Sequence, residues 1–91
     1  MIHSEILKQL PDWSIVNQKL HRRFECQDFV QAFEFMSQVA IVAEKMNHHP
    51  EWSNVYKLVD VDLTTHSQGC ISELDLELAE KMNVIFKKIS K

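Results

Sequence analysis

A chain of 91 residues has room for one domain built around a single hydrophobic core. Its composition, 45% hydrophobic and 25% charged with one glycine and two prolines, excludes a disordered chain and a loop-rich disulfide scaffold. The net charge of −3 gives no general electrostatic basis for binding nucleic acid, so we expect no nucleic-acid partner. No apolar run approaches the ~20 residues of a membrane span, so we expect no association with a membrane.

The start of the chain predicts a short helix and then a β-hairpin. Residues 4–10 have a helical pattern, with Ser4 as a candidate N-cap and Pro11 as the stop signal. Two strands are predicted at residues 13–16 and 19–26, joined by a short turn, although the alternation of the second strand is imperfect.

The cysteines and the N-terminal residues bear on the cellular compartment. Cys26 and Cys70 are isolated in the sequence and form no CxxC motif, which favours reduced thiols over a disulfide. The N-terminal segment lacks the basic and apolar regions of a signal peptide. We therefore expect a cytoplasmic protein.

The clearest element is a long amphipathic helix that begins after Asp28. Gln31, three residues later, completes a pattern similar to a capping box. The predicted buried stripe, spaced by three and four residues, comprises Phe29, Ala32, Phe33, Met36, Val39, Ala40, Ala43 and Met46. A second apolar surface, suited to a subunit contact, is predicted from Phe35, Ile41 and Val42. The helix is expected to end near Asn47 or His48, ahead of Pro50.

The second half of the chain predicts two more strands and a final helix. Residues 54–56 form a candidate short strand, and the following segment alternates with a period of two up to His66. Its predicted core positions are Val59, Val61, Leu63 and Thr65. After a turn at 67–69, Ser72 is the predicted cap of a helix whose apolar positions are Leu74, Leu78, Met82, Ile85, Phe86 and Ile89.

This order of elements predicts the fold. Helix, two strands, helix, two strands and helix are best accommodated by an α+β protein with two layers. We expect residues 1–91 to form one domain, with a four-stranded antiparallel sheet and two long helices plus the short N-terminal helix on one face.

Three of the five histidines fall at the ends of predicted elements, and they are the candidate chemistry of the chain. Histidine is the side chain whose ordinary pKa lies nearest neutrality, so it can serve as both acid and base. Pro50 disfavours a helical conformation at His49, so the imidazoles of His48 and His49 are expected to point in different directions. Glu44 precedes His48 by four residues and is expected to pair with it on the helix. His66 closes the following strand.

Simpler interpretations of these residues remain open. A histidine pair at the end of a helix can merely complement the helix dipole. Asp75 lies three residues after Ser72, where a capping box alone would account for it. A zinc site is disfavoured because adjacent histidines of opposed orientation are awkward ligands and no HExxH or CxxC signature is present.

The ordered array of these residues resembles a known family. The array runs Glu44-x3-His48-His49-Pro50, then Tyr56, His66 and Asp75, and it resembles the signature of the pterin-4a-carbinolamine dehydratases. The flanking segments Ala43-Glu44-Lys45, Pro50 to Tyr56 and Leu63 to His66 look similar too. The resemblance covers most of the chain, from about Leu10 to the C-terminal helix.

The resemblance implies an activity that needs neither a metal nor a cofactor. Relatives dehydrate a 4a-hydroxytetrahydropterin to the quinonoid dihydropterin, which restores the cofactor of aromatic amino acid hydroxylases. It implies His49 as the principal acid/base, His66 as the second, and His48 as a residue that binds and polarises the pterin. It also implies that Glu44 orients His48 and that Asp75 hydrogen-bonds His66. The remaining candidates for the substrate cleft and its surroundings are Trp13 and Pro50.

The resemblance also frames the expected partners. We expect a pterin substrate, a functional link to a hydroxylase, and a homodimer or homotetramer, since sheet edges and a broad apolar helix need cover. Animal relatives also act as dimerisation cofactors of a transcription factor, so an interaction module without significant catalysis is the alternative. Asn47 stands where many relatives have Asp, which removes one charge beside the histidines.

Overall fold

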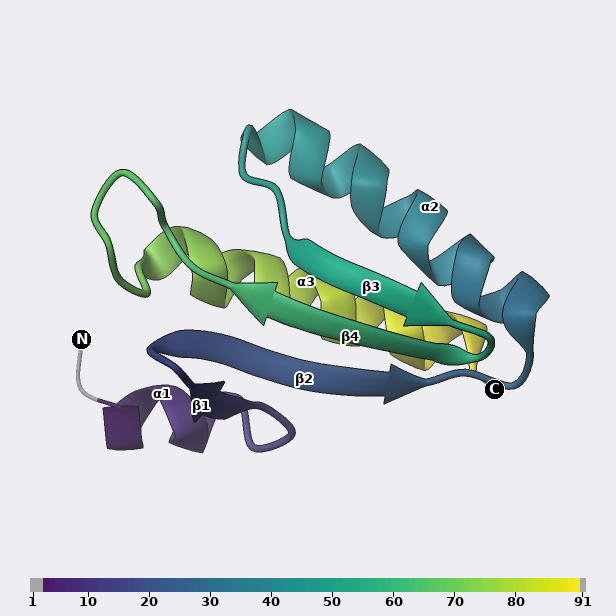
Figure 1. Ribbon diagram of the computed structural model, residues 1–91, viewed down its shortest axis with the longest axis horizontal. Helices are drawn as coiled ribbons and strands as arrows, with labels where there is room; N and C mark the ends of the chain where they lie inside the picture. Colours follow the sequence, from purple (N-terminus) through teal and green to yellow (C-terminus); the bar gives the residue numbers. More distant parts are fainter. Residues whose placement is uncertain (1–2, 91) are drawn as a thin grey trace.

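The computed structural model describes residues 3–90 and arranges them in two layers, one of helices and one of strands (Figure 1). The helices are α1 His3–Gln9, α2 Phe29–Met46 and α3 Glu73–Ile89. The strands are β1 Ser14–Val16, β2 Lys19–Glu25, β3 Glu51–Val55 and β4 Leu58–Leu63. Ser4 lies inside α1, so its predicted role as the N-cap was wrong.

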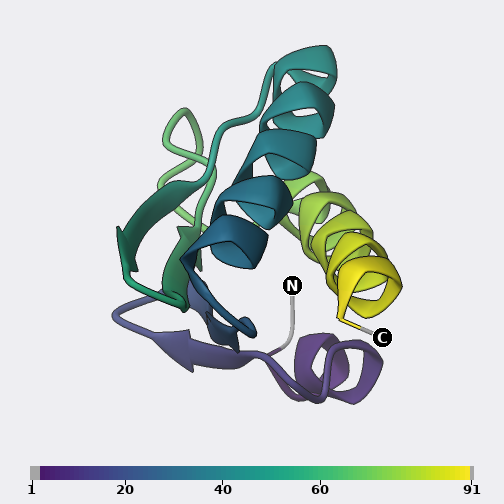
Figure 2. The ribbon, with the colours of Figure 1, turned by 90° about the vertical axis from the view of Figure 1, so that its right-hand side faces the viewer.

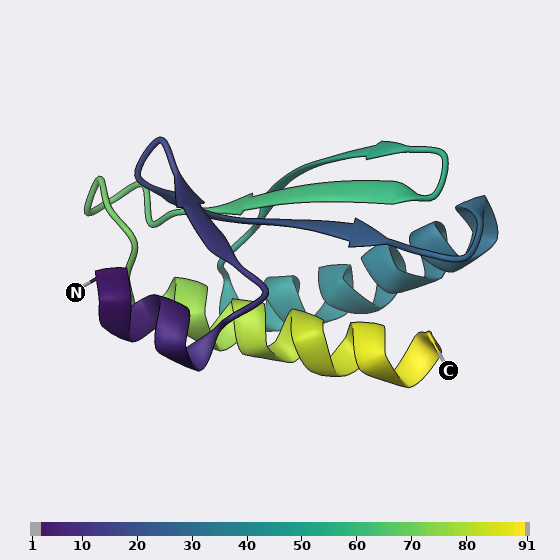
Figure 3. The same ribbon diagram turned by 90° about the horizontal axis from the view of Figure 1, so that it is seen from below.

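The strands form one antiparallel sheet in the order β1-β2-β4-β3. In its central pair, Leu20 lies opposite Leu63 and Phe24 lies opposite Val59, so apolar side chains share one face. All three helices lie on that side of the sheet, as the views along and below the sheet show (Figures 2 and 3). The predicted α+β fold is confirmed.

The core fills the space between the sheet and the helices. Its largest fully buried side chains are Phe24, Phe35, Leu10, Leu20, Leu63, Leu78, Met82, Val39, Val59 and Val61. The imperfect alternation of β2 has a physical explanation, since Arg22 points inward with the rest. Its guanidinium lies 4.3 Å from the centre of the Phe24 ring and donates to Asn83 Oδ1 at 2.6 Å. Burial lowers the pKa of Arg22 from its usual value.

The buried face of α2 differs from the prediction. Phe35, assigned to an outer surface, is fully buried, whereas Phe29 and Phe33 are about half exposed. The error arises because α2 is apolar around most of its circumference, so spacing alone does not select the inward side. The exposed apolar face of α2 consists of Phe29, Val30, Phe33 and Ile41.

Two connections meet at one end of the fold. Because consecutive elements run in alternating directions, the α2–β3 and β4–α3 connections lie together, while the β3–β4 turn lies at the other end (Figure 1). The predicted histidines fall in these two connections. Both cysteines are free, Cys26 buried and Cys70 exposed, and burial raises the pKa of the Cys26 thiol. Within residues 3–90, none of the helices has the length and apolarity required to cross a membrane.

Candidate active site

Asn47 determines how the two adjacent histidines leave α2. It has φ 52° and ψ 40°, the left-handed conformation that asparagine tolerates better than most residues. The N–H groups of Asn47 and His48 donate to the carbonyls of Glu44 and Ala43, both at 3.1 Å, which closes the helix in a Schellman pattern. The helix therefore ends at Met46, two residues before His48, and the chain turns inward at Asn47.

His48 is buried and pairs with Asp75. Its Nε2 lies 2.5 Å from Asp75 Oδ1, a hydrogen bond that joins the α2–β3 connection to the first turn of α3. Two predicted pairings were therefore wrong: Glu44 is not the partner of His48, and Asp75 is not the partner of His66. The left-handed turn at Asn47 is the cause, because it removes His48 from the helical face that carries Glu44.

His49 takes the place predicted for His48. Its Nε2 forms a hydrogen bond of 2.9 Å with Glu44 Oε1 across the end of the helix. Both side chains are exposed, that of His49 by 59%. A histidine that keeps a carboxylate neighbour while facing solvent is free to meet a bound molecule.

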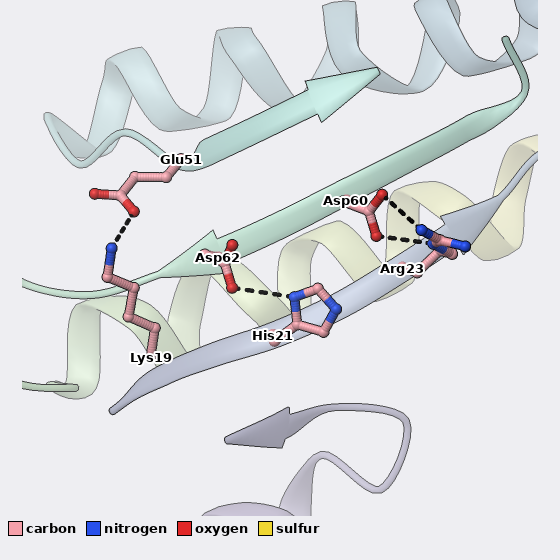
Figure 4. A network of polar contacts seen from close by, with 6 residues as sticks. All are labelled: Lys19, His21, Arg23, Glu51, Asp60 and Asp62. Atoms are coloured by element: carbon pink, nitrogen blue, oxygen red, sulfur yellow. Dashed lines mark hydrogen bonds and ion pairs between the residues drawn. The ribbon is translucent and has the colours of Figure 1, made fainter. Parts of the chain in front are cut away.

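His66 belongs to a second polar group formed around Glu51. His66 Nε2 lies 2.8 Å from Glu51 Oε2, and Lys19 Nζ donates to Glu51 Oε1 at 2.6 Å. The hydrogen bond from Lys19, aided by the nearby His66, holds the pKa of Glu51 below its usual range. The Lys19–Glu51 pair spans from β2 to β3 across the end of β4 (Figure 4).

Sequence reasoning missed Glu51 and Lys19, and also the hydroxyl groups around Asp75. Asp75 Oδ2 accepts from the Ser72 N–H at 2.8 Å and from Thr65 Oγ1 at 2.9 Å, and this carboxylate is fully buried. The predicted capping box is present, yet it accounts for only part of what Asp75 does. Thr65 was the sequence signal for these hydroxyl groups, because it is a polar residue that continues the alternating buried positions of the apolar strand β4.

The other candidates lie at different depths. Trp13 is in the core, edge-on to Phe24 at 5.8 Å, and its indole N–H donates to Asn83 Oδ1 at 2.9 Å. Packing in the core and the hydrogen bond to Asn83 therefore account for Trp13 without a role in the substrate cleft. Pro50 is half-buried between the histidine pair and β3, where it directs the chain into the sheet.

The structure groups these residues into acid–base pairs. Within residues 3–90, no three His, Cys, Asp or Glu side chains are grouped closely enough to hold a metal ion. The arrangement offers three imidazoles, each beside a separate carboxylate, at one end of the fold. Such groups can donate and accept protons on a small molecule.

Substitution of Asn47 tests whether its left-handed conformation stabilises the C-terminal end of α2. Replacing Asn47 by valine is expected to lower the free energy of unfolding by about 1–2 kcal/mol, since a β-branched side chain is strained at positive φ. Asn47→Gly should leave the stability close to that of the wild type because glycine adopts this conformation freely. Urea denaturation of both variants measures the difference, and equal stabilities would contradict the assignment.

Comparison with known proteins identifies relatives over most of the chain. The family described as pterin 4 alpha carbinolamine dehydratase matches residues 2–85. A Prochlorococcus marinus (strain MIT 9303) protein, provisionally named a pterin-4-alpha-carbinolamine dehydratase, is 49% identical over 82 residues, covering 90% of this chain and 85% of its own. A Mesorhizobium japonicum protein with the same provisional name is 51% identical over 82 residues, covering 88% and 84% of the two chains.

A solved structure is similar in both sequence and fold. A crystal structure from Brucella melitensis, described as a transcriptional coactivator/pterin dehydratase, has a TM-score of 0.86 and 44% sequence identity. The match covers 93% of this chain and 96% of that one.

Proposed function

The chain belongs to the pterin 4 alpha carbinolamine dehydratase family and is a hydro-lyase, and we propose that it dehydrates 4a-hydroxytetrahydropterin by histidine acid–base catalysis. The observation that carries the proposal is the grouping of three histidine–carboxylate pairs at one end of the fold. Their nitrogen–oxygen distances are 2.5 Å for His48, 2.9 Å for His49 and 2.8 Å for His66.

The reaction requires one proton donor and one proton acceptor. The bond from C4a to the hydroxyl oxygen breaks, and that oxygen leaves as water after it receives a proton. The N5 lone pair forms the new double bond to C4a, and the proton on N5 is lost to a base or to solvent. Carboxylates stabilise the positive charge that develops on the ring and on a protonated imidazole.

The environments of the histidines support different roles. His49 and His66 have exposed side chains, each within hydrogen-bond reach of a carboxylate, so they suit the two proton-transfer steps. His48 is nearly buried and held by Asp75, which suits a fixed contact to the pterin. Glu44 then orients His49, and Asp75 orients His48.

The activity can be measured against the spontaneous reaction. Ultraviolet absorbance follows enzymatically generated 4a-hydroxytetrahydropterin as it converts to the quinonoid form. We expect the protein to accelerate this conversion in substoichiometric amounts without added metal. A rate equal to the spontaneous one, with folding verified by circular dichroism, would overturn the proposal.

This activity would return the pterin cofactor of aromatic amino acid hydroxylases to its reducible form. A functional link to such a hydroxylase in the cytoplasm therefore belongs to the proposal.

A second candidate function is protein association through α2. The exposed apolar face of α2 favours it, as does the adjoining open, shallow surface formed by Ala40, Ile41, Glu44 and Lys45. The sheet also has β1 and β3 as its edges. We expect a homodimer or homotetramer, and the Brucella melitensis protein is described as both a coactivator and a dehydratase.

Charge substitutions separate assembly from catalysis. Phe33→Lys places a charge in the centre of the exposed apolar face of α2, whereas Val84→Lys places it at an exposed apolar position of α3. Light scattering coupled to gel filtration is expected to show a smaller particle for the Phe33 variant only. An unchanged particle for the Phe33 variant would remove this face from the assembly.

A further inference from the structure

Thr65 is a polar residue in a place otherwise reserved for apolar side chains. Val59, Val61 and Leu63 form the buried phase of β4, and Thr65 continues that phase with 5% of its surface exposed. A buried hydroxyl costs free energy unless its hydrogen bonds are satisfied. Its partners therefore indicate why it is there.

The hydrogen-bond donors around Asp75 can be assigned by counting protons. An ionised carboxylate only accepts, so the single Thr65 hydroxyl proton is donated to Asp75 Oδ2, 2.9 Å away. Thr65 Oγ1 then accepts from the Ser72 hydroxyl at 2.5 Å. Ser72 Oγ in turn accepts from the Leu74 N–H at 3.2 Å. The donors run in one direction, from the first turn of α3 to the carboxylate.

The other carboxylate oxygen fixes the proton on His48. Asp75 Oδ1 lies 2.5 Å from His48 Nε2, and an ionised carboxylate accepts, so Nε2 carries a proton. In the neutral ring, Nδ1 is then the acceptor. Nδ1 has no hydrogen-bond partner among residues 3–90, and no buried side-chain nitrogen or oxygen there lacks one, so Nδ1 reaches the surface.

We propose that Thr65 and Ser72 are positioning residues that keep Asp75 oriented toward His48 Nε2–H and thereby present His48 Nδ1 to the substrate. The effect on kcat rests on the proposed dehydration, whereas the effect on the His48 tautomer does not depend on that function. Thr65 and Ser72 act through Asp75 and His48 and touch no reacting atom. In this arrangement, the hydroxyls make one imidazole tautomer the ground state before the pterin arrives.

Thr65→Val tests the proposal because valine keeps the shape of threonine and removes the hydroxyl. The matched control is Thr64→Val, the same change one residue earlier, where the side chain lies on the opposite face and forms no hydrogen bond within residues 3–90. Thr65→Ser restores the hydroxyl. Nitrogen-15 NMR of histidine-labelled protein reports the tautomer of His48 without any substrate. The spectra are recorded at a pH high enough for the imidazole to be neutral, as judged from a pH titration of the same sample.

We expect the wild type, Thr64→Val and Thr65→Ser to hold His48 predominantly as the Nε2–H tautomer. Thr65→Val should give a mixture of tautomers and lower kcat about tenfold with little change in KM, since a hydrogen bond to a charged group is lost. Ser72→Ala should shift the tautomers less, because Thr65 can still donate to Asp75. An unchanged tautomer in Thr65→Val, or a kcat loss that Thr65→Ser fails to restore, would overturn the role of Thr65.

The two proposals fail in different ways. If the wild type does not accelerate dehydration while Thr65→Val still disturbs the His48 tautomer, the positioning of His48 stands and the proposed function falls. If dehydration is fast and Thr65→Val affects only thermal stability, the positioning role falls and the proposed function stands. A Ser72→Ala spectrum identical to that of the wild type would remove Ser72 alone.

Discussion

Replacing His49 by alanine is expected to lower kcat/KM for pterin carbinolamine dehydration by about 10²–10⁴-fold, the usual contribution of a positioned acid or base. The physical reason is its combination of exposure and a fixed partner. The His49 ring faces solvent while Glu44 Oε1 holds its Nε2 at 2.9 Å. Alanine removes the proton carrier and leaves Glu44 exposed, so little stability should be lost.

The chain contains a matched control for this variant. His21 Nδ1 lies 3.0 Å from Asp62 Oδ1 on the face of the sheet away from the helices (Figure 4), a histidine–carboxylate pair similar to that of His49. His21→Ala should retain activity within about twofold of the wild type. Initial rates above the spontaneous reaction measure both variants. If His49→Ala keeps most of its activity, proton transfer belongs to His66 or His48 instead.

Phe24→Ala is expected to have the largest effect on stability, lowering the free energy of unfolding by about 3–5 kcal/mol. Phe24 is 1% exposed and lies at the centre of an aromatic group, with ring centres 4.6 Å from Phe35 and 5.2 Å from Phe86. The guanidinium of Arg22 stacks on the same ring. A domain of this size has only about 5–15 kcal/mol in total, so a large part of the population should unfold under mild conditions.

Urea denaturation measures this loss, and one fixed protein concentration for all variants holds the concentration dependence of any assembly constant. Val84→Ala, an apolar truncation at an exposed site on α3, is the control and should change the stability by less than about 0.5 kcal/mol. A loss below 1 kcal/mol for Phe24→Ala would mean that the core collapses around the cavity.

The fold could be predicted from sequence because its signals are local. Period-two alternation marked Val59, Val61 and Leu63 as the inner face of β4, and Asp28 and Ser72 were placed correctly as helix caps. The inward face of α2 could not be predicted in the same way. Phe33 and Phe35 are both apolar, and only packing against the sheet decides which of them is buried.

The partners of the site could not be predicted either, since one backbone conformation decides them. A continued helix would have placed His48 above Glu44, and the left-handed turn at Asn47 gives that position to His49. Asp75 reaches His48, and Thr65 reaches Asp75, only through the tertiary fold, because the three residues lie far apart along the chain. The residue types of the candidate site were therefore predictable, whereas their pairing was not.

Asp75 has a consequence for how this sequence can change over evolutionary time. Stabilising a protein commonly costs activity, because functional groups are held in unfavourable settings. Here one carboxylate closes the capping box of α3 and also holds His48. A substitution at this position would be penalised twice, through a weaker helix start and through a misplaced imidazole. Selection for folding alone would thus preserve part of the candidate site, even in a lineage that no longer used it.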